Sequence, residues 1–153
     1  MLENKEQVQI RTIIYKTEAY RIELEVRDKV LRKPLGMSLY DENLEAEKQD
    51  THFGAYRNDQ LVGVLILTRL NATEVRMRQV AVLEEWQGQG VGSELVYYAE
   101  QYAKNKGYTV ILLHARKTAA GFYEKLGYEK TGDEFLEINI PHYSMRKSLI
   151  CRA

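Results

Sequence analysis

The chain has 153 residues, with 22 basic and 22 acidic side chains that balance formally at neutral pH. A chain of this length fits one domain, whose core is large enough to fold without disulfides or a structural metal. The charge balance and the lack of a basic stripe argue against nucleic-acid binding. The polar N-terminus has no apolar signal core, and the longest apolar run is far too short to cross a membrane, so we expect a cytoplasmic protein without a membrane partner.

The only cysteine, Cys151, is the third residue from the C-terminal end. A single thiol cannot form an intramolecular disulfide or a Cys-x-x-Cys metal pattern, and a near-terminal position is poor for a nucleophile that needs a positioned base. We therefore expect a bystander thiol and no metal site. The chain has eleven tyrosines and only three phenylalanines. Such a ratio fits a solvated edge of the core, a cleft lined with hydroxyl groups or a subunit interface, so a homodimer is possible.

The first predicted elements are a strand and a helix. Residues 7–15 are rich in β-branched apolar side chains and indicate a strand. Thr17 is a candidate N-cap for a helix over residues 19–31, where apolar side chains recur at near-helical spacing. Pro34 and Gly36 end this helix.

A hairpin and a further strand are expected next. The acidic segment 41–50 has no strong period and fits a short helix or a loop. Two apolar runs, at residues 52–56 and 61–67, flank a short polar turn and predict a β-hairpin. The next strand covers residues 73–83.

The second half alternates helices and strands. Residues 91–106 form a long amphipathic pattern, and residues 108–113 are almost entirely apolar, as in a strand buried on both faces. A helix over residues 118–126, with Thr118 as candidate N-cap, precedes strand-like runs at residues 135–140 and 142–149. This order of elements predicts an α+β or α/β domain around one mixed sheet.

The strand over residues 73–83 changes phase. Val75 and Met77 point to one face, whereas Val80 and Val82 are the larger apolar residues in the opposite phase. A strand keeps a period of two unless an extra residue is inserted, so this pattern favours a β-bulge at residues 78–79. A straight strand with mixed faces is the alternative.

A glycine cluster follows at the entrance of the long helix: Gly88, Gly90 and Gly92. Without Cβ atoms, backbone N–H groups can curl around an anion, and the helix N-terminus adds attraction for phosphate. A tight turn without a ligand is the alternative. The spacing fits neither a dinucleotide fingerprint nor a Walker loop, since no acid ends the next strand and no Gly-Lys-Ser/Thr is present.

What remains is the pattern Q/R-x-x-G-x-G/A, met by Gln87, Gly90 and Gly92. Thirty residues later, the segment 120–128 reads AGFYEKLGY. With these two motifs the chain resembles the GNAT superfamily of N-acetyltransferases over most of its length. Its segment 135–147 also resembles the E-x-x-I-x-H-x-x-M-x-K tail of the ElaA-like bacterial branch.

The resemblance implies a fold and a reaction. The fold is a single GNAT-type domain over residues 1–153, of α/β (α+β) class, with a mixed, twisted central sheet of about six to seven strands, a bulged and splayed fourth strand and about four helices. The reaction is acetyl transfer from acetyl-CoA to a primary amine of a small molecule or peptide, by direct attack in a ternary complex and without a metal. A non-catalytic acyl-CoA-binding sensor or interaction module on the same fold is the alternative.

The resemblance also implies cofactor-binding residues. The pantetheine arm pairs with the backbone of the splayed strand, and the N–H of Val82 is a candidate oxyanion donor. The CoA pyrophosphate lies on the amides of the glycine turn. The residues concerned are Val80, Ala81 and Val82 in the strand, and Gln87, Gly88, Gln89, Gly90, Val91, Gly92 and Ser93 in the turn.

Tyr123 occupies the position where many family members place a tyrosine that protonates the departing thiolate. A phenol with a pKa near 10 can protonate a thiolate near 8.5 once the two are aligned. Packing of the ring under CoA without proton transfer is the alternative. Where the family often has an Asn that touches CoA, this chain has Arg116 and Lys117, which either reach the ADP phosphates or are simply solvated.

The acceptor side is less well marked. The amine must lose a proton before it attacks, and His114, at a strand end, is the candidate base, although a structural histidine is an even alternative. Glu137, His142 and Arg78 are candidates for acceptor binding, and His52 and Arg76 are further residues that could face the acceptor.

Overall fold

The computed structural model describes residues 8–150. Cys151 lies outside the described residues, as does Gln7, the first residue of the predicted N-terminal strand. Contacts divide the chain into two compact units. Unit 1 holds the chain up to Thr68 together with Gln79–Ala99, and unit 2 holds Arg69–Arg78 and the chain from Glu100 onward. We describe each unit by itself.

Strand β1 (Gln9–Ile13) and helix α1 (Glu18–Arg27) open unit 1. The hydroxyl of Thr17 accepts a hydrogen bond from the amide of Tyr20, which confirms the predicted N-cap. The helix runs on into a π-helical turn, Asp28–Arg32, and a 3-10 turn follows, Lys33–Leu35. The acidic segment forms two more 3-10 turns, Leu39–Asp41 and Leu44–Gln49, and places Glu47 in the interior.

The predicted hairpin consists of β2 (Thr51–Arg57) and β3 (Gln60–Arg69). Asn58 and Asp59, which join them, both have positive φ, as a two-residue turn between antiparallel strands requires. Strand β1 pairs antiparallel with β2 on its other side, so that Ile13 lies opposite His52.

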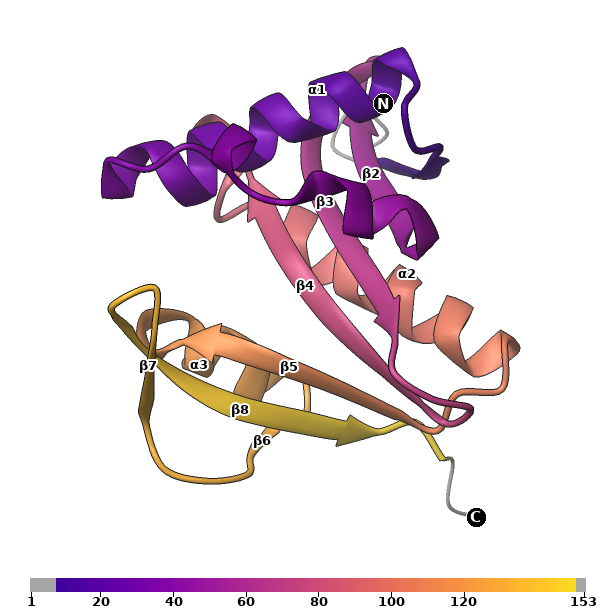
Figure 1. The fold of residues 1–153 in the computed structure, drawn as a ribbon. Coiled ribbons are helices and arrows are strands. Elements are labelled where there is room, and N and C mark those ends of the chain that lie inside the picture. The colour runs from indigo at the N-terminus through magenta and orange to yellow at the C-terminus, as the bar shows by residue number, and fades with distance from the viewer. Residues whose placement is uncertain (1–7, 151–153) are drawn as a thin grey trace. The chain divides into compact units, whose positions relative to one another are not determined.

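The remaining elements are β4 (Glu74–Val82), α2 (Val91–Asn105), β5 (Val110–Arg116), α3 (Ala120–Lys125), β6 (Glu129–Lys130), β7 (Phe135–Glu137) and β8 (Ile140–Ser148). The hydrogen-bonded order is β1-β2-β3-β4-β5-β8-β6, with β7 also paired to β8, and β4 carries residues of both units (Figure 1). β4 and β5 are parallel, whereas β8 is antiparallel to β5, β6 and β7. This mixed sheet confirms the predicted fold class.

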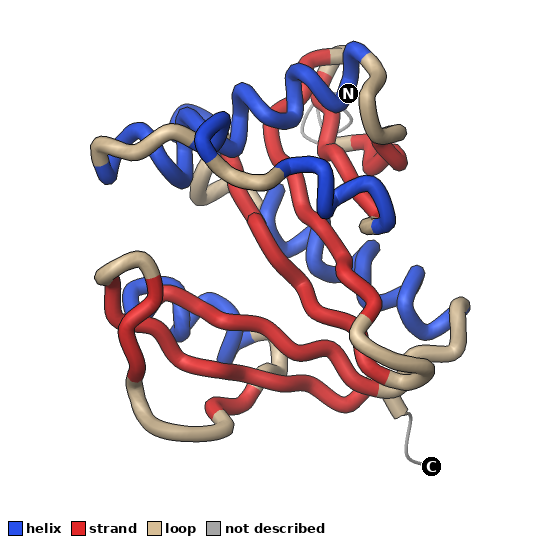
Figure 2. The backbone as a smooth tube through the Cα atoms, in the orientation of Figure 1, coloured by secondary structure: helices blue, strands red, loops and turns tan. Residues whose placement is uncertain are grey.

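Unit 1 has a helix on each face of β3. Val64 packs in a buried cluster with Tyr20 and Leu24 of α1, whereas a Cβ on the neighbouring Gly63 would meet Val91 and Leu95 of α2. Successive strand residues point to opposite faces, so α1 and α2 cover opposite sides of this strand. Figure 2 shows the two helices on either side of the red strands.

In unit 2 a buried carboxylate ties α2 to the last strand. Glu100 accepts a hydrogen bond of 2.8 Å from the Tyr128 hydroxyl and lies 3.1 Å from Lys147 Nζ. The same ammonium donates to the carbonyl of Leu126 at 2.7 Å. Gly127, with φ of 97°, makes the tight turn after α3 against the Lys147 side chain.

Several elements differ from the sequence prediction. Ala119, not Thr118, is the N-cap of α3, because a 3-10 turn at Lys117–Ala119 precedes the helix. The two-residue strand β6 was not predicted, since it is too short to show a period. Pro141 lies inside β8 rather than between two strands. Within residues 8–150, the helices are too short or too polar for a membrane span.

Candidate functional site

The turn between β4 and α2 has the backbone that its glycines suggest. Gly88 and Gly90 have φ of 77° and 86°, values that side-chain-bearing residues rarely adopt. A Cβ built on either would meet no heavy atom within 4 Å, so the turn keeps open space in front of its backbone. The first amides of a helix have no intrahelical acceptor, and those of α2 begin directly after Gly90. The turn therefore fits a phosphate-bearing ligand.

A second glycine sets the position of this helix entrance. A Cβ on Gly63 would lie 3.0 Å from Val91 Cγ1, 3.1 Å from Leu95 Cδ1 and 3.3 Å from the carbonyl of Ala81. Only glycine lets the first two turns of α2 approach β3 this closely. Val91 and Leu95 are buried as a result.

The predicted interruption of β4 lies at Gln79, whose φ is 55°. The ladder with β5 ends two residues earlier, at Met77. Val75 and Met77 are buried as expected, but Val80 and Val82 are only half-buried. Between them Ala81 is buried, packed in the α1 cluster, so the small residue takes the covered position and the two valines lie on the more open side.

Gln87, the first residue of the motif, ties the turn back to β4. Its Nε2 donates to the Val82 carbonyl at 2.8 Å. The expected oxyanion donor is the N–H of Val82, which this bond does not occupy. Gln89 makes a similar but longer bond, 3.3 Å, to the carbonyl of Glu85. Both glutamine side chains therefore brace the turn, while the glycine backbone faces open space.

In unit 2 the fold brings together three residues that are far apart in sequence: His114 on β5, Glu137 on β7 and His142 on β8. His114 Nδ1 lies 2.8 Å from Glu137 Oε1, and His142 Nε2 lies 3.9 Å from Glu137 Oε2. The ring of Phe135 packs edge-on to His114, with centroids 5.1 Å apart. The pairing of β7 and β5 with β8 creates this group.

The hydrogen bonds fix which ring nitrogen each histidine uses. A carboxylate only accepts, so neutral His114 donates from Nδ1 to Glu137 and leaves Nε2 as an acceptor. His142 likewise donates from Nδ1, to the carbonyl of Ile140 at 2.7 Å. The His114 side chain keeps 31% of its surface exposed, whereas the His142 side chain keeps 5%. His114 thus has an oriented and accessible imidazole ring, whereas the ring of His142 is largely enclosed.

Tyr123 lies on α3, with only 8% of its surface exposed. Burial raises the pKa of the Tyr123 hydroxyl, so the phenol keeps its proton throughout the neutral range. Its ring packs edge-on against Phe122 and Tyr128. Such a group can offer a hydrogen to an anion but does not ionise by itself.

The arginines of β4 have half-buried side chains. The Arg78 residue interacts with another part of the protein. The buried Nε of Arg76 has no hydrogen-bond partner in the part of the chain that the structure describes. Lys117, considered above for the ADP phosphates, forms an ion pair of 3.0 Å with Glu134. This pairing favours a structural role for Lys117.

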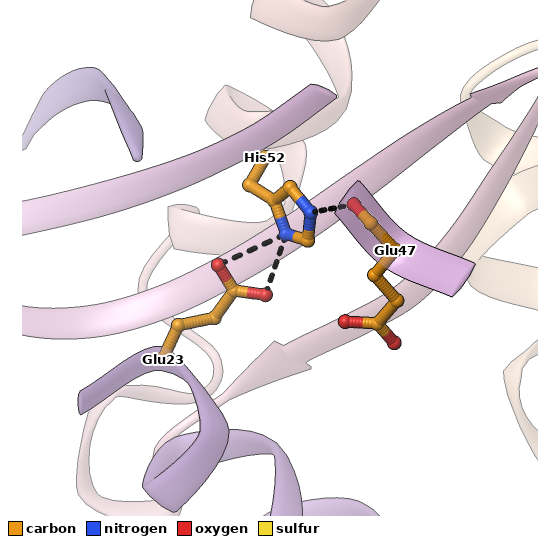
Figure 3. A group of neighbouring side chains, drawn as sticks. All are labelled: Glu23, Glu47 and His52. Atoms are coloured by element: carbon orange, nitrogen blue, oxygen red, sulfur yellow. Dashed lines mark hydrogen bonds and ion pairs between the residues drawn. The ribbon is translucent and has the colours of Figure 1, made fainter. Parts of the chain in front are cut away.

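The expectation that His52 faces the acceptor is wrong. His52 is 1% exposed and belongs to a buried ionic cluster with Glu23, Arg27 and Glu47 (Figure 3). Sequence analysis missed this cluster, although Glu23 and Arg27 share a face of α1 with Tyr20 and Leu24. A charged pair at i, i+4 on the apolar face of a helix was the available signal.

Comparison with known proteins agrees with the motifs. The sequence profile of the acetyltransferase (GNAT) domain matches residues 17–149. A Bacillus subtilis protein described as an acetyltransferase is 31% identical over 128 residues, which cover 80% of this chain and 85% of that protein.

Solved structures share the fold. An N-acetyltransferase candidate from Lactobacillus plantarum has a TM-score of 0.80 and 26% identity, covering 92% of this chain and 99% of its own. Escherichia coli ElaA has a TM-score of 0.78 at 17% identity, with the same coverage. An aminoglycoside 6'-N-acetyltransferase in complex with coenzyme A has a TM-score of 0.77 at 19% identity, covering 95% of this chain and 99% of its own.

At 17% and 19% identity, the last two structures show only that the fold is shared. The domain profile is evidence for the family, because it matches most of the chain. The profile, the glycine turn and the interrupted β4 strand agree with one another. The chain therefore belongs to the GNAT family of acetyltransferases and is an acyltransferase.

Proposed function

We propose that this protein transfers an acetyl group from acetyl-CoA to a primary amine of a small molecule or peptide, by direct attack in a ternary complex. The observation that carries the proposal is the turn at Gly88 and Gly90, where two positive φ angles and open space precede the N-terminus of α2. This turn follows β4 after the short 3-10 turn Glu84–Trp86, and β4 itself leaves its ladder with β5 after Met77.

The proposed CoA-binding group lies in unit 1. The amides of residues 87–93 would hold the pyrophosphate, because the helix N-terminus and the glycine backbone both favour an anion. The backbone of Val80, Ala81 and Val82 would pair with the amides of the pantetheine arm as an added strand does. The N–H of Val82 would stabilise the negative charge that develops on the thioester oxygen.

The proposed proton transfers use unit 2. His114 Nε2 takes a proton from the acceptor ammonium, and Glu137 stabilises the resulting imidazolium through Nδ1. The freed amine nitrogen attacks the thioester carbon and a C–N bond forms; the nitrogen then gives up its second proton to solvent, the C–S bond breaks, and CoA leaves as a thiolate. Tyr123 donates a hydrogen bond to that sulfur as the bond breaks, and the released thiolate takes its proton from solvent. Glu137, His142 and Arg78 are proposed to contact the acceptor.

The raised pKa of the Tyr123 hydroxyl limits how far its proton can move to the sulfur. A phenol whose pKa is raised by burial is a weaker acid than free tyrosine, so full transfer to a thiolate near 8.5 is uphill. We therefore propose that Tyr123 acts mainly by donating a strong hydrogen bond to the sulfur as the C–S bond breaks. This is stabilisation of the leaving group within the transition state.

The test is release of free thiol from acetyl-CoA with a panel of primary amines and peptides, together with calorimetric titration of CoA. We expect CoA binding, and thiol release that depends on the amine. Tight CoA binding without thiol release across a broad panel would indicate a non-catalytic acyl-CoA-binding module instead. Absence of CoA binding would overturn the assignment of the glycine turn.

A further inference from the structure

The buried ionic cluster in unit 1 is built around one guanidinium. Arg27 Nη1 lies 2.9 Å from Glu23 Oε2 and 2.8 Å from Glu47 Oε1, and its Nη2 lies 2.5 Å from Glu47 Oε2. His52 Nδ1 lies 2.8 Å from Glu23, and its Nε2 lies 3.1 Å from the carbonyl of Glu47 (Figure 3). Arg27, Glu23, Glu47 and His52 are each at most 4% exposed.

This cluster is an ionic lock and not a metal site. Glu23, Glu47 and His52 have ligand atoms within 4.8 Å of one another, as a metal would need. However, Arg27 already holds both Glu47 oxygens and one oxygen of Glu23. Each His52 nitrogen also faces an acceptor, so a protonated ring satisfies both. A further cation would have to displace a buried guanidinium.

The third guanidinium nitrogen of Arg27, Nε, contacts β4. Its Nε donates to Oε1 of Gln79 at 3.3 Å. Gln79 has a φ of 55° and lies two residues beyond Met77, where the ladder between β4 and β5 ends. A residue with a side chain resists this backbone conformation, so it persists only where its surroundings hold it. The link from Arg27 is the side-chain contact that can do so.

We infer that Arg27, fixed in place by Glu23 and Glu47, is a positioning residue for the strand that binds acetyl-CoA. Through Gln79 it holds the backbone turn that immediately precedes residues 80–82. The cluster thus joins α1, the 3-10 turn of Glu47 and β2 to the point where the proposed pantetheine-binding strand begins. This inference rests on the proposed function, since it assigns the arginine to the CoA-binding strand.

The first test removes the hydrogen bond between Arg27 and Gln79 without disfavouring the positive φ at residue 79. In the variant Gln79→Asn, asparagine tolerates a positive φ at least as well as glutamine does. Its side chain is one methylene shorter, so it cannot keep the hydrogen bond to Arg27. Gln79→Glu keeps the length and strengthens the acceptor. We expect Gln79→Asn to raise the Kd for CoA and the KM for acetyl-CoA about tenfold with little change in kcat, as for a lost hydrogen bond to a charged group. Gln79→Glu should stay within about twofold of the natural protein.

A double-mutant cycle gives the second readout. Arg27→Lys keeps the cation but loses Nε, so it should weaken CoA binding, and combining it with Gln79→Asn should add little. Asp28→Ala is the matched control: Asp28 follows Arg27 in the chain, is buried, and accepts from the Leu39 amide at 2.8 Å, so it takes no part in the bond between Arg27 and Gln79. It should lower the melting temperature and leave CoA affinity unchanged.

Two outcomes would overturn the inference. One is Gln79→Asn binding CoA as tightly as the natural protein. The other is a loss of CoA affinity in Asp28→Ala that matches the loss in Gln79→Asn, which would show that lower stability alone explains the effect. In both cases the natural protein still binds CoA. If the natural protein itself fails to bind CoA, the proposed function fails, and this distinguishes the two.

Discussion

At Gly90 no neighbouring atom of the described chain accounts for the absence of a Cβ. Its φ is 86°, and a Cβ there would meet nothing within 4 Å. Gly63 is the opposite case, since a Cβ there would run into Val91 and Leu95. A side chain at Gly90 would therefore strain the backbone and fill the open space in front of it, but would not clash with the rest of the protein.

We expect Gly90→Val to abolish measurable CoA binding, because the branched side chain would fill the space in front of the turn and strain its backbone. Isothermal calorimetry with CoA checks this. Gly107→Val is the matched control, with φ of 93° and equally open surroundings at the other end of α2. It should destabilise the fold similarly and still bind CoA; unchanged affinity in folded Gly90→Val would refute the phosphate site.

Tyr123 and Tyr128 offer a matched pair. Burial raises the pKa of both hydroxyls, but the Tyr128 hydroxyl donates to Glu100, whereas that of Tyr123 makes no hydrogen bond with the described residues. We expect Tyr123→Phe to lower kcat about 100-fold and to spare the Kd for CoA. Tyr128→Phe should lower the melting temperature and leave kcat nearly intact. Equal kcat values in the two variants at saturating substrates would remove Tyr123 from the reaction.

At the scale of elements, the pairing of β5, β7 and β8 decides which histidine can act. Glu137 lies 2.8 Å from His114 but 3.9 Å from His142, so the carboxylate orients the first ring. An oriented ring with a free acceptor nitrogen is the arrangement of a general base.

We expect His114→Gln to lower kcat 100-fold or more and Glu137→Gln to lower it about tenfold, since the amide still accepts from Nδ1 but no longer stabilises the imidazolium. Initial rates at saturating acetyl-CoA and amine measure both. His142→Gln is the control and should change kcat less than His114→Gln. The reverse order would transfer the role of base to His142.

Sequence patterns predicted the elements well where period and glycine chemistry coincide. The hairpin, the bulge at Gln79 and the turn at Gly90 were found this way, because local backbone demands leave a mark on local residue choice. Strand β6 was missed because two residues carry no period. The link from Arg27 to Gln79 joins residues 52 positions apart, and no local pattern records such a contact.

For the whole molecule, the ionic cluster decides how stability changes with pH. Burial alone would lower the pKa of His52, but the hydrogen bond and charge of Glu23 outweigh it and raise the pKa. Burial alone would raise the pKa of Glu47, but hydrogen bonds from Arg27 outweigh it and lower the pKa. The two shifts stabilise the fold over different ranges of pH.

A raised pKa at His52 means that the folded protein binds this proton more tightly than the unfolded chain does. The resulting stability is complete below the unfolded pKa, about 6.5, and is lost as the pH rises through the folded value. For Glu47 the sign is opposite: its contribution is present above the unfolded pKa, about 4.3, and is lost as the pH falls through the folded value. The cluster thus stabilises the fold most between these two ranges, at mildly acidic pH.

The free energy of unfolding should therefore fall as the pH rises above about 6.5, and His52→Gln should remove most of that fall. Because the raised pKa of His52 links its proton to folding, the natural protein should lose more stability than His52→Gln over this range. Urea unfolding of both proteins at several pH values measures it. The groups that face His52 are Glu23, Glu47, Arg27 and the edge of Tyr20, and all are kept in the variant. Titrating groups that do not interact with His52 contribute equally to both proteins, so parallel curves would show that His52 does not bind its proton more tightly in the folded state.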